Sequence, residues 1–302
     1  MQKAIVTGGA GFIGSHLVSE LVERGFDTHI IDDFSGGRME KRKHPKATYH
    51  EVDIRDYESI APIIAGASCV FHEAALPRVQ FSIEHPQETF SVNVDGFVSV
   101  LRASHEGGVK RLIYAASSSA YGDQTKMPLS EDFPAQPKSP YGLQKYIGEL
   151  SCRLWNEVYG LSTVSLRYFN VYGANFDPNG PYALVIGKFL LQKSKGEPLT
   201  ITGDGTHTRD FTNVRDVVRA NMLAMESEKV GKGEVINIGA GRNASINEIA
   251  SMIGGPVVHV EPRLEPAHTL ADTAKAKKLL GWEPTVKLED GIAELKKNSG
   301  LL

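Results

Sequence analysis

The chain has 302 residues, with 33 Lys and Arg against 36 Asp and Glu and a formal net charge of −3. This length suits one large domain or two closely joined domains, and the lack of a basic excess argues against a general nucleic-acid or membrane-surface protein. Charged residues at 23% and hydrophobic residues at 41% are ordinary for a globular protein and argue against global disorder.

Cysteine usage and the N-terminal segment bear on location. Cys69 and Cys152 are too few for a disulfide framework or a four-thiolate zinc site, and we expect no metal site. Residues 1–9 run directly into a strand-like segment without a signal-peptide pattern, and no apolar stretch approaches the ~20 residues that span a bilayer. We therefore expect a cytoplasmic protein with no membrane or nucleic-acid partner.

The first two-thirds of the chain alternates short apolar, β-branched runs with longer amphipathic stretches. The short runs predict strands at Ala4–Thr7, Thr28–Ile31, Ala67–Phe71, Arg111–Ala115 and Thr163–Leu166. The stretches between them predict helices at Ile13–Arg24, Asp56–Ile64, Pro86–Glu106 and Tyr141–Tyr159. Doubly apolar strands that alternate with helices indicate an α/β fold of Rossmann type, with a doubly wound parallel sheet.

After about residue 170 the alternation loosens. Loop signals cluster at Gly173–Tyr182, Gly203–Arg209, Gly239–Ala244 and Glu261–Ala267, and helices are expected at Asp216–Met225 and Ile246–Ile253. We expect residues 1–172 to form the sheet domain and residues 173–302 a smaller α/β substrate-binding lobe. Later segments are allowed to contribute strands to the larger sheet.

A glycine-rich turn follows the first predicted strand. Gly8 permits the tight turn, Gly11 lets the backbone approach a pyrophosphate, and Gly14 allows close packing of the following helix. The N–H groups at the start of that helix, at Phe12 and Ile13, then meet the anion at the positive end of the helix dipole. With a strand before the turn and a helix after it, a dinucleotide site is favoured over an ordinary surface turn.

Acidic residues follow the next two strands. Asp32 ends the second strand, where a carboxylate accepts hydrogen bonds from an adenosine ribose and repels a 2′-phosphate, which favours NAD over NADP. Asp33 could share this role. Asp53, beside Ile54, is taken as the end of the third strand, where it could reach the adenine or merely cap the helix that starts at Asp56.

Tyr141 and Lys145 lie four residues apart, on one face of a predicted helix. A tyrosine with a pKa of about 10 is a poor base at neutral pH, and a neighbouring ammonium lowers that pKa by stabilising the phenolate. The pair opens a helix at the carboxyl edge of the sheet, where ligands bind, which favours catalysis over surface packing. The serine run Ser117–Ser119, with Ser118 at its centre, reaches the same edge and either bridges tyrosine and substrate or forms only a turn.

Taken together, the glycine turn, the serine run and the Tyr141–Lys145 pair resemble the extended short-chain dehydrogenase/reductase superfamily. Further segments resemble its nucleotide-sugar branch, with the closest likeness to UDP-hexose 4-epimerases: Arg167–Gly173, Gly203–Gly205, Thr208–Phe211, Ala271–Asp272 and Leu280–Trp282. The resemblance covers nearly the whole chain. It implies an enzyme with bound NAD that interconverts UDP-glucose with UDP-galactose, and UDP-N-acetylglucosamine with UDP-N-acetylgalactosamine, through a transient 4-keto intermediate.

The resemblance also implies roles for individual residues. The catalytic residues would be Ser117, Tyr141 and Lys145. NAD would be held by Gly8, Gly11, Phe12, Ile13, Gly14, Asp32, Asp33, Asp53, Ile54, Ala74, Leu76, Asn93, Tyr141, Lys145 and Tyr168. The UDP-sugar would contact Ser117, Ser118, Tyr141, Asn170, Leu184, Val185, Thr200, Ile201, Thr202, Arg209, Arg263, Glu265 and Thr269.

The substrate side departs from the family pattern in two places. Relatives often carry Arg-x-Gly-Asp where this chain has Arg263–Pro266, so the roles of Arg263 and Glu265 are shifted, and Pro77–Arg78 alter the rim of the pocket. Thr269 stands where a tyrosine would close the pocket to an N-acetyl group, whereas a bulky Leu184 argues in the other direction.

Two alternatives to an epimerase remain. Related dehydratases and decarboxylases carry an acid between the catalytic hydroxyl and the Tyr-Gly pair, where this chain has Ser118–Ala120. A non-catalytic NAD-binding member of the fold is the second alternative.

The resemblance further implies a homodimer formed by the helices Pro86–Glu106 and Tyr141–Tyr159. Their apolar residues would also serve the core: Phe90, Phe97, Leu101, Leu154 and Trp155.

Overall fold

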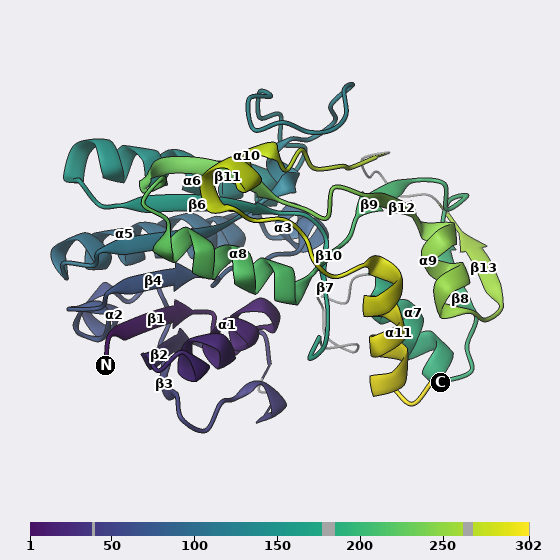
Figure 1. Ribbon diagram of the computed structural model, residues 1–302, viewed down its shortest axis with the longest axis horizontal. Helices are drawn as coiled ribbons and strands as arrows, with labels where there is room; N and C mark the ends of the chain where they lie inside the picture. The colour runs from purple at the N-terminus through teal and green to yellow at the C-terminus, as the bar shows by residue number, and fades with distance from the viewer. Residues whose placement is uncertain (38–39, 177–184, 262–267, 302) are drawn as a thin grey trace.

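A seven-stranded sheet forms the centre of the molecule in the computed structural model, which describes residues 1–37, 40–176, 185–261 and 268–301 (Figure 1). The strand order is β11-β6-β5-β4-β1-β2-β3, and every neighbouring pair is parallel. The sheet confirms the expected doubly wound α/β fold of Rossmann type. Its strands are β1 (Lys3–Thr7), β2 (Asp27–Asp32), β3 (Thr48–Glu51), β4 (Cys69–His72), β5 (Arg111–Ser117), β6 (Thr163–Tyr168) and β11 (Lys232–Ile238).

Helices cover both faces of this sheet and bury its apolar side chains. One face packs against α1 (Phe12–Glu23), α8 (Val214–Glu226) and α10 (Ala274–Leu280), and the opposite face against α2 (Tyr57–Ile64), α5 (Gly96–Glu106) and α6 (Pro140–Tyr159). In Figure 1, α1 and α8 lie on the near side of the strands. The doubly apolar strands of the sequence therefore have the two-sided burial that a parallel sheet requires.

The helix boundaries follow local sequence signals. Ser139 caps α6 by accepting a hydrogen bond from the Gly142 N–H, Pro140 takes the first helical position, and Gly160 ends the helix with a φ of 73°. The predicted helix Pro86–Glu106 is present as α4 (Pro86–Phe90), a π-helical segment, Ser91–Asp95, and α5, and a short α3 (Val79–Glu84) precedes it.

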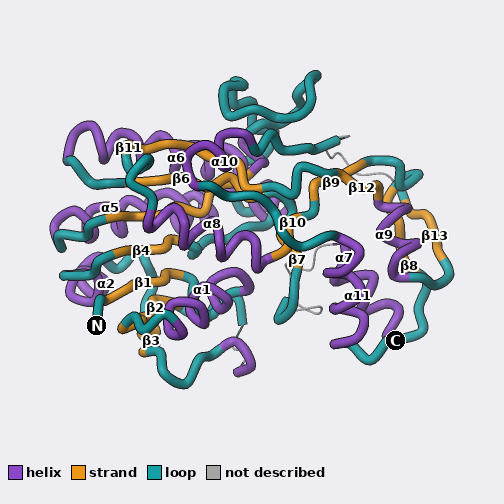
Figure 2. The backbone as a smooth tube through the Cα atoms, in the orientation of Figure 1, coloured by secondary structure: helices purple, strands orange, loops and turns teal. Residues whose placement is uncertain are grey.

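A smaller group of elements lies beyond one end of the sheet (Figure 2). The helices and strands of this group share a hydrophobic core of their own. In the part of the chain that the structure describes, no helix is long and apolar enough to cross a membrane. Its elements are α7 (Val185–Ser194), β8 (Leu199–Thr202), β9 (Thr208–Asp210), β12 (Asn243–Ser245), α9 (Ile246–Ile253), β13 (Val257–Val260) and α11 (Leu288–Asn298), with β7 (Val171–Tyr172) paired to β10 (Thr212–Asn213) at the junction.

The chain crosses between the two groups more than once. β11, α8 and α10 all come from beyond residue 172, yet they belong to the large sheet and its covering layer. The expected boundary between the two domains at residue 172 stays a prediction. The crossings place the end of β6 beside the turn after β11, next to the smaller group.

A buried ion pair joins α6 to β6. The Arg167 guanidinium donates from Nε and Nη2 to the two oxygens of Glu149, both at 2.7 Å, and lies 4.4 Å from the centre of the Tyr121 ring. Both charged side chains are almost fully buried. The hydrogen bonds and the attraction between the charges offset the cost of removing them from water.

We expect Glu149→Gln to destabilise the fold by about 3–5 kcal/mol, because it leaves the Arg167 charge buried without a partner. Urea unfolding followed by circular dichroism measures the effect. Glu294→Gln is the matched control, since it breaks an ion pair with Arg215 that is exposed to water. Equal stability of the two variants would contradict the assigned role of the buried pair.

Candidate active site

The carboxyl ends of β1 and β4 meet at a glycine turn. Gly8 has a φ of +69°, and a Cβ atom there would lie 2.6 Å from the backbone nitrogen of Ala74. A Cβ atom on Gly14 would overlap the Gly8 carbonyl oxygen, so α1 packs directly on the turn. α1 begins after Gly11 with no side-chain cap and no acidic residue in its first turn, which leaves the N–H groups near Phe12 and Ile13 for an anion. These features fit the pyrophosphate of a dinucleotide.

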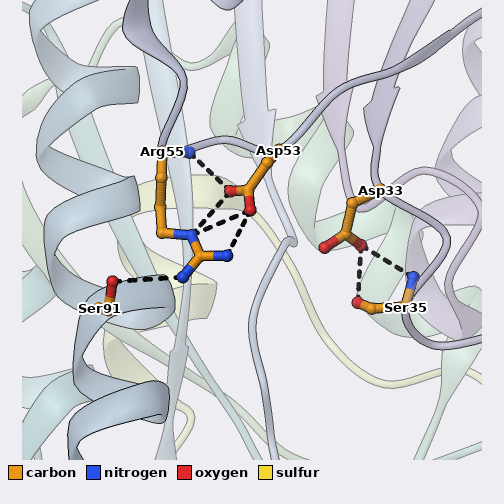
Figure 3. A network of polar contacts seen from close by, with 5 residues as sticks. All are labelled: Asp33, Ser35, Asp53, Arg55 and Ser91. Carbon is orange, nitrogen blue, oxygen red and sulfur yellow. Dashed lines mark hydrogen bonds and ion pairs between the residues drawn. The ribbon is translucent and has the colours of Figure 1, made fainter.

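Asp32 and Asp33 lie at the end of β2. The Asp32 carboxylate accepts hydrogen bonds from the Ala10 N–H at 2.9 Å and the Phe34 N–H at 2.8 Å, and burial raises its pKa. Because an ionised carboxylate has about four acceptor positions, Asp32 retains capacity for ribose hydroxyls. The Asp33 carboxylate instead accepts from the backbone and hydroxyl of Ser35 (Figure 3).

The Asp53 side chain pairs with an arginine and does not cap a helix. Arg55 donates to both oxygens of Asp53 and also to Ser91, and this hydrogen bonding lowers the pKa of Asp53 (Figure 3). The expectation that Asp53 ends a strand is wrong, because β3 stops at Glu51, and the cap of α2 is Asp56. Asp53 still lies near Asp33 at this edge of the sheet (Figure 3), and the neighbouring Ile54 is buried.

Asn93 supports the segment after β4 through its own hydrogen bonds. Its Oδ1 accepts from the Leu76 N–H at 2.8 Å, and its Nδ2 donates to the Leu76 carbonyl at 3.2 Å and to Gln144 at 2.8 Å. Asn93 is buried and these bonds occupy both polar ends of its amide. The residue therefore shapes the strand-to-helix connection from Ala74 to Leu76 rather than extending into the cleft.

The structure brings Ser117, Tyr141 and Lys145 together. Ser117 closes β5, and its Oγ lies 3.1 Å from the Oγ of Ser119 and also hydrogen-bonds to the Tyr141 side chain. The Lys145 ammonium lies 6.0 Å from the centre of the Tyr141 ring and donates to the Ala115 carbonyl at 2.7 Å. Ser118 begins the 3₁₀ turn that follows Ser117, so the predicted turn is present, and the bridge between tyrosine and substrate stays a prediction.

The electrostatics of this group differ from the expectation. Burial raises the pKa of Tyr141 to about 12, and the negative charge of Glu73 adds to the rise, while the hydrogen bond with Ser117 opposes it. Burial also lowers the pKa of Lys145 to about 8. Loss of hydration therefore outweighs the hydrogen bond with Ser117 and leaves the pKa of Tyr141 above its ordinary value, and the lowering of that pKa by Lys145 stays a prediction.

Glu73 is a site residue that the sequence analysis missed. It follows β4 directly, and its carboxylate accepts a hydrogen bond from the Tyr168 hydroxyl at 2.8 Å, which in turn accepts from Asn221 at 2.8 Å. Burial raises the pKa of Glu73 to about 7, while Lys145 and the hydrogen bond from Tyr168 pull it down. The available signal was an acid directly after the short, mainly apolar strand that ends at His72.

The expected substrate residues that the structure describes include residues beside Asp210, in β8 and at the start of α7. Asn170 and Thr269 both contact the backbone of Asp210, beside Arg209. In β8, Ile201 is buried in the core of the smaller group, and Thr200 hydrogen-bonds to Gln192, so the strand offers mainly its backbone and Thr202. Val185 begins α7. Three expected residues lie outside the described part of the chain: Leu184, Arg263 and Glu265.

Known proteins named as UDP-sugar epimerases and as a UDP-sugar decarboxylase are similar to this chain over nearly its whole length. A UDP-glucose 4-epimerase from Thermotoga maritima, solved with UDP-glucose, is 37% identical with a TM-score of 0.92 over 98% of this chain and 99% of its own. A UDP-N-acetylglucosamine 4-epimerase from Methanobrevibacter ruminantium M1, solved with UDP-N-acetylmuramic acid, is 35% identical with a TM-score of 0.92 over 98% and 97%. A UDP-N-acetyl-alpha-D-glucosaminuronate decarboxylase from Bacillus cytotoxicus is 36% identical over 97% of this chain and 96% of its own.

The family match extends through the glycine turn, the Ser117–Tyr141–Lys145 group and β11. It covers residues 4–239 and confirms both the predicted resemblance and the expectation of NAD as the cofactor. The chain belongs to the NAD dependent epimerase/dehydratase family.

Proposed function

We propose that this protein catalyses the reversible 4-epimerisation of UDP-hexoses: UDP-glucose with UDP-galactose, and UDP-N-acetylglucosamine with UDP-N-acetylgalactosamine. The observation that carries the proposal is the convergence of Ser117, Tyr141 and Lys145 at the sheet edge, next to the glycine turn. The epimerases solved with UDP-linked ligands, described above, support the choice of substrate class.

We assign each residue of the site a separate role in the reaction. When bound, NAD supplies the hydride acceptor for C4 of the sugar and later the hydride donor. The Tyr141 phenolate takes the proton of the 4-hydroxyl and, as the phenol, returns it, and Ser117, hydrogen-bonded to Tyr141, orients the sugar oxygen and bridges the transfer. Lys145 is fixed by the Ala115 carbonyl, where its ammonium stabilises the phenolate against the cost of burial.

The two lobes hold different parts of the ligands. The glycine turn and Asp32 would hold the dinucleotide, with Lys145 and Tyr168 at the reactive end. Arg209, Asn170 and Thr269 would hold the UDP-sugar, because a diphosphate removed from water needs a fixed cation and hydrogen-bond donors. A keto intermediate anchored only through UDP can turn its sugar ring, so that hydride returns to the opposite face.

A dehydratase or decarboxylase is the alternative, and a decarboxylase is among the relatives. Loss of a hydroxyl group needs an acid close to the leaving group. The turn from Ser118 to Ala120, where those enzymes carry that acid, holds only serine and alanine side chains. Incubation with UDP-sugars, UDP-glucuronate and dTDP-glucose, followed by mass spectrometry, separates the two: an epimerase leaves the mass unchanged.

Tyr141→Phe tests the proposed base. We expect kcat with the four UDP-hexoses to fall about a hundredfold or more, because the phenol that moves the proton is gone. Product formation is followed by chromatography, and the cofactor released on denaturation shows whether NAD is retained. Tyr146→Phe, on the same helix, is the matched control with unchanged activity. Turnover by Tyr141→Phe close to that of the wild type would overturn the assignment.

Glu73→Gln tests the electrostatics of the site. The negative charge of Glu73 raises the pKa of Tyr141, so its removal lowers that pKa. Because the base works as the phenolate, activity rises with pH through this pKa, and the acidic limb of the rate profile should move down by about 1 pH unit or less. Glu84→Gln, on α3, is the control. An unmoved limb, or one moved to higher pH, would argue against the coupling.

We also propose a homodimer, with the cytoplasmic location expected from the sequence remaining a prediction. Four apolar side chains recur on one face of α6 and are exposed to solvent: Leu143 (46%), Leu150 (38%), Leu154 (50%) and Val158 (60%). Phe97 and Leu101 lie instead on the buried face of α5, in the core against the sheet, whereas Phe90 is exposed. An apolar stripe of this extent suits a face covered by a second copy of the chain.

Light scattering should give twice the chain mass of 32.9 kDa. Leu154→Glu should shift the protein to a monomer, because it places a charge in the proposed interface. Val258→Glu, on the exposed strand β13, is the matched control that should leave the mass unchanged. A monomeric wild-type protein would exclude the dimer.

A further inference from the structure

Asp210 is a completely buried carboxylate that holds three separate segments together. Its Oδ1 accepts from the Ala240 N–H at 2.6 Å, and its Oδ2 accepts from the Gly241 N–H at 3.0 Å and the Ala271 N–H at 3.1 Å. Ala240 and Gly241 form the turn after β11 of the main sheet, and Ala271 belongs to a segment bridged to Leu129. The carboxylate therefore fixes β9, on which it lies, to the edge of the large sheet.

The backbone of Asp210 is equally engaged. Its N–H donates to the Thr269 hydroxyl at 3.3 Å, and its carbonyl accepts from the Asn170 amide at 3.3 Å. Arg209 is the preceding residue of the same strand and is largely buried. Three side chains assigned to the UDP-sugar are thus either bonded to Asp210 or adjacent to it in the chain.

We propose that Asp210 is a positioning residue for the substrate: its carboxylate fixes β9, and with it the side chains of Arg209, Asn170 and Thr269, in the arrangement that receives the diphosphate. This inference rests on the proposed function, since it takes UDP as the ligand. Asp210 itself contacts no substrate. Its hydrogen bonds set where the cation and the two polar side chains lie before the ligand binds, which removes that ordering cost from binding.

The chemistry at this position requires a carboxylate. Burial raises the pKa of Asp210 to about 6, and the three N–H donors oppose that rise, so the group is ionised at neutral pH and satisfied by its donors. In Asp210→Asn the amide NH₂ faces at least one N–H donor in either orientation, because both oxygens of the native group are occupied. A buried donor then loses its acceptor.

Calorimetry with UDP is the first measurement. We expect Asp210→Asn to bind UDP about tenfold to a hundredfold more weakly than the wild type, as loss of a buried hydrogen bond predicts. The NAD content should stay unchanged, and KM for the UDP-sugar should rise by more than kcat falls. A general loss of structure would lower NAD content as well. If Asp210→Asn does not fold, Asp210→Ser, which keeps one acceptor and has no NH₂ group, provides the same readout.

Asp216→Asn is the matched control. Asp216 is also a buried carboxylate that accepts backbone hydrogen bonds, at 2.9 Å from Thr285 and 3.0 Å from Val286, and within the described part of the chain its side-chain partners are Thr285 and Arg219 rather than the proposed substrate residues. It should lose comparable thermal stability and keep UDP affinity within about twofold of the wild type.

The outcomes separate the two proposals. Wild-type protein that does not bind UDP overturns the proposed function, and the inference with it. Wild-type protein that binds UDP, together with Asp210→Asn protein that binds it equally well, overturns the positioning role alone. Equal weakening in the Asp210 and Asp216 variants assigns the loss to stability and likewise overturns it.

Discussion

The close approach of two backbones at Gly8 is the constraint on which the site depends. No side chain fits between Gly8 and Ala74, or between Gly14 and the carbonyl of Gly8, so the ends of β1 and β4 and the start of α1 come into direct contact. This contact lies where the strand order reverses, between β1 and β4, which is where open parallel sheets bind ligands. The helix terminus, Asp32 and Glu73 occupy their positions because the turn is this tight.

Burial then controls the chemistry of the cleft. Loss of hydration raises the pKa of Tyr141 to about 12 and of Glu73 to about 7, and lowers that of Lys145 to about 8. In each case the charged form is penalised, and Glu73 and Lys145 offset part of each other's penalty, whereas the charge of Glu73 adds to that of Tyr141. A phenolate in this cleft therefore depends on its neighbours for stabilisation, and a positively charged ligand beside it would act in the same direction as Lys145.

The sequence predicted the parts of the site that are encoded locally. The glycine turn, the acid after β2 and the Tyr141–Lys145 spacing each depend on a few consecutive residues and on one strand or helix. Glu73 and Asp210 were missed because their partners come from distant segments, Tyr168 in one case and the turn after β11 in the other. The sequence also gave no indication that burial raises the pKa of Tyr141, because burial is a property of the fold.

The strand β6 links the residues proposed for the cofactor to those proposed for the substrate. Tyr168, its last residue, donates to Glu73 on the cofactor side, and Asn170, two residues later, donates to the carbonyl of Asp210 on the substrate side. β11 pairs with β6 along its length and then supplies the turn that binds the Asp210 carboxylate. The residues proposed for the cofactor and for the substrate thus lie on one pair of strands and on the segments that follow them. A UDP-sugar bound beside β9, as proposed, would therefore lie against the same pair of strands that positions Tyr168.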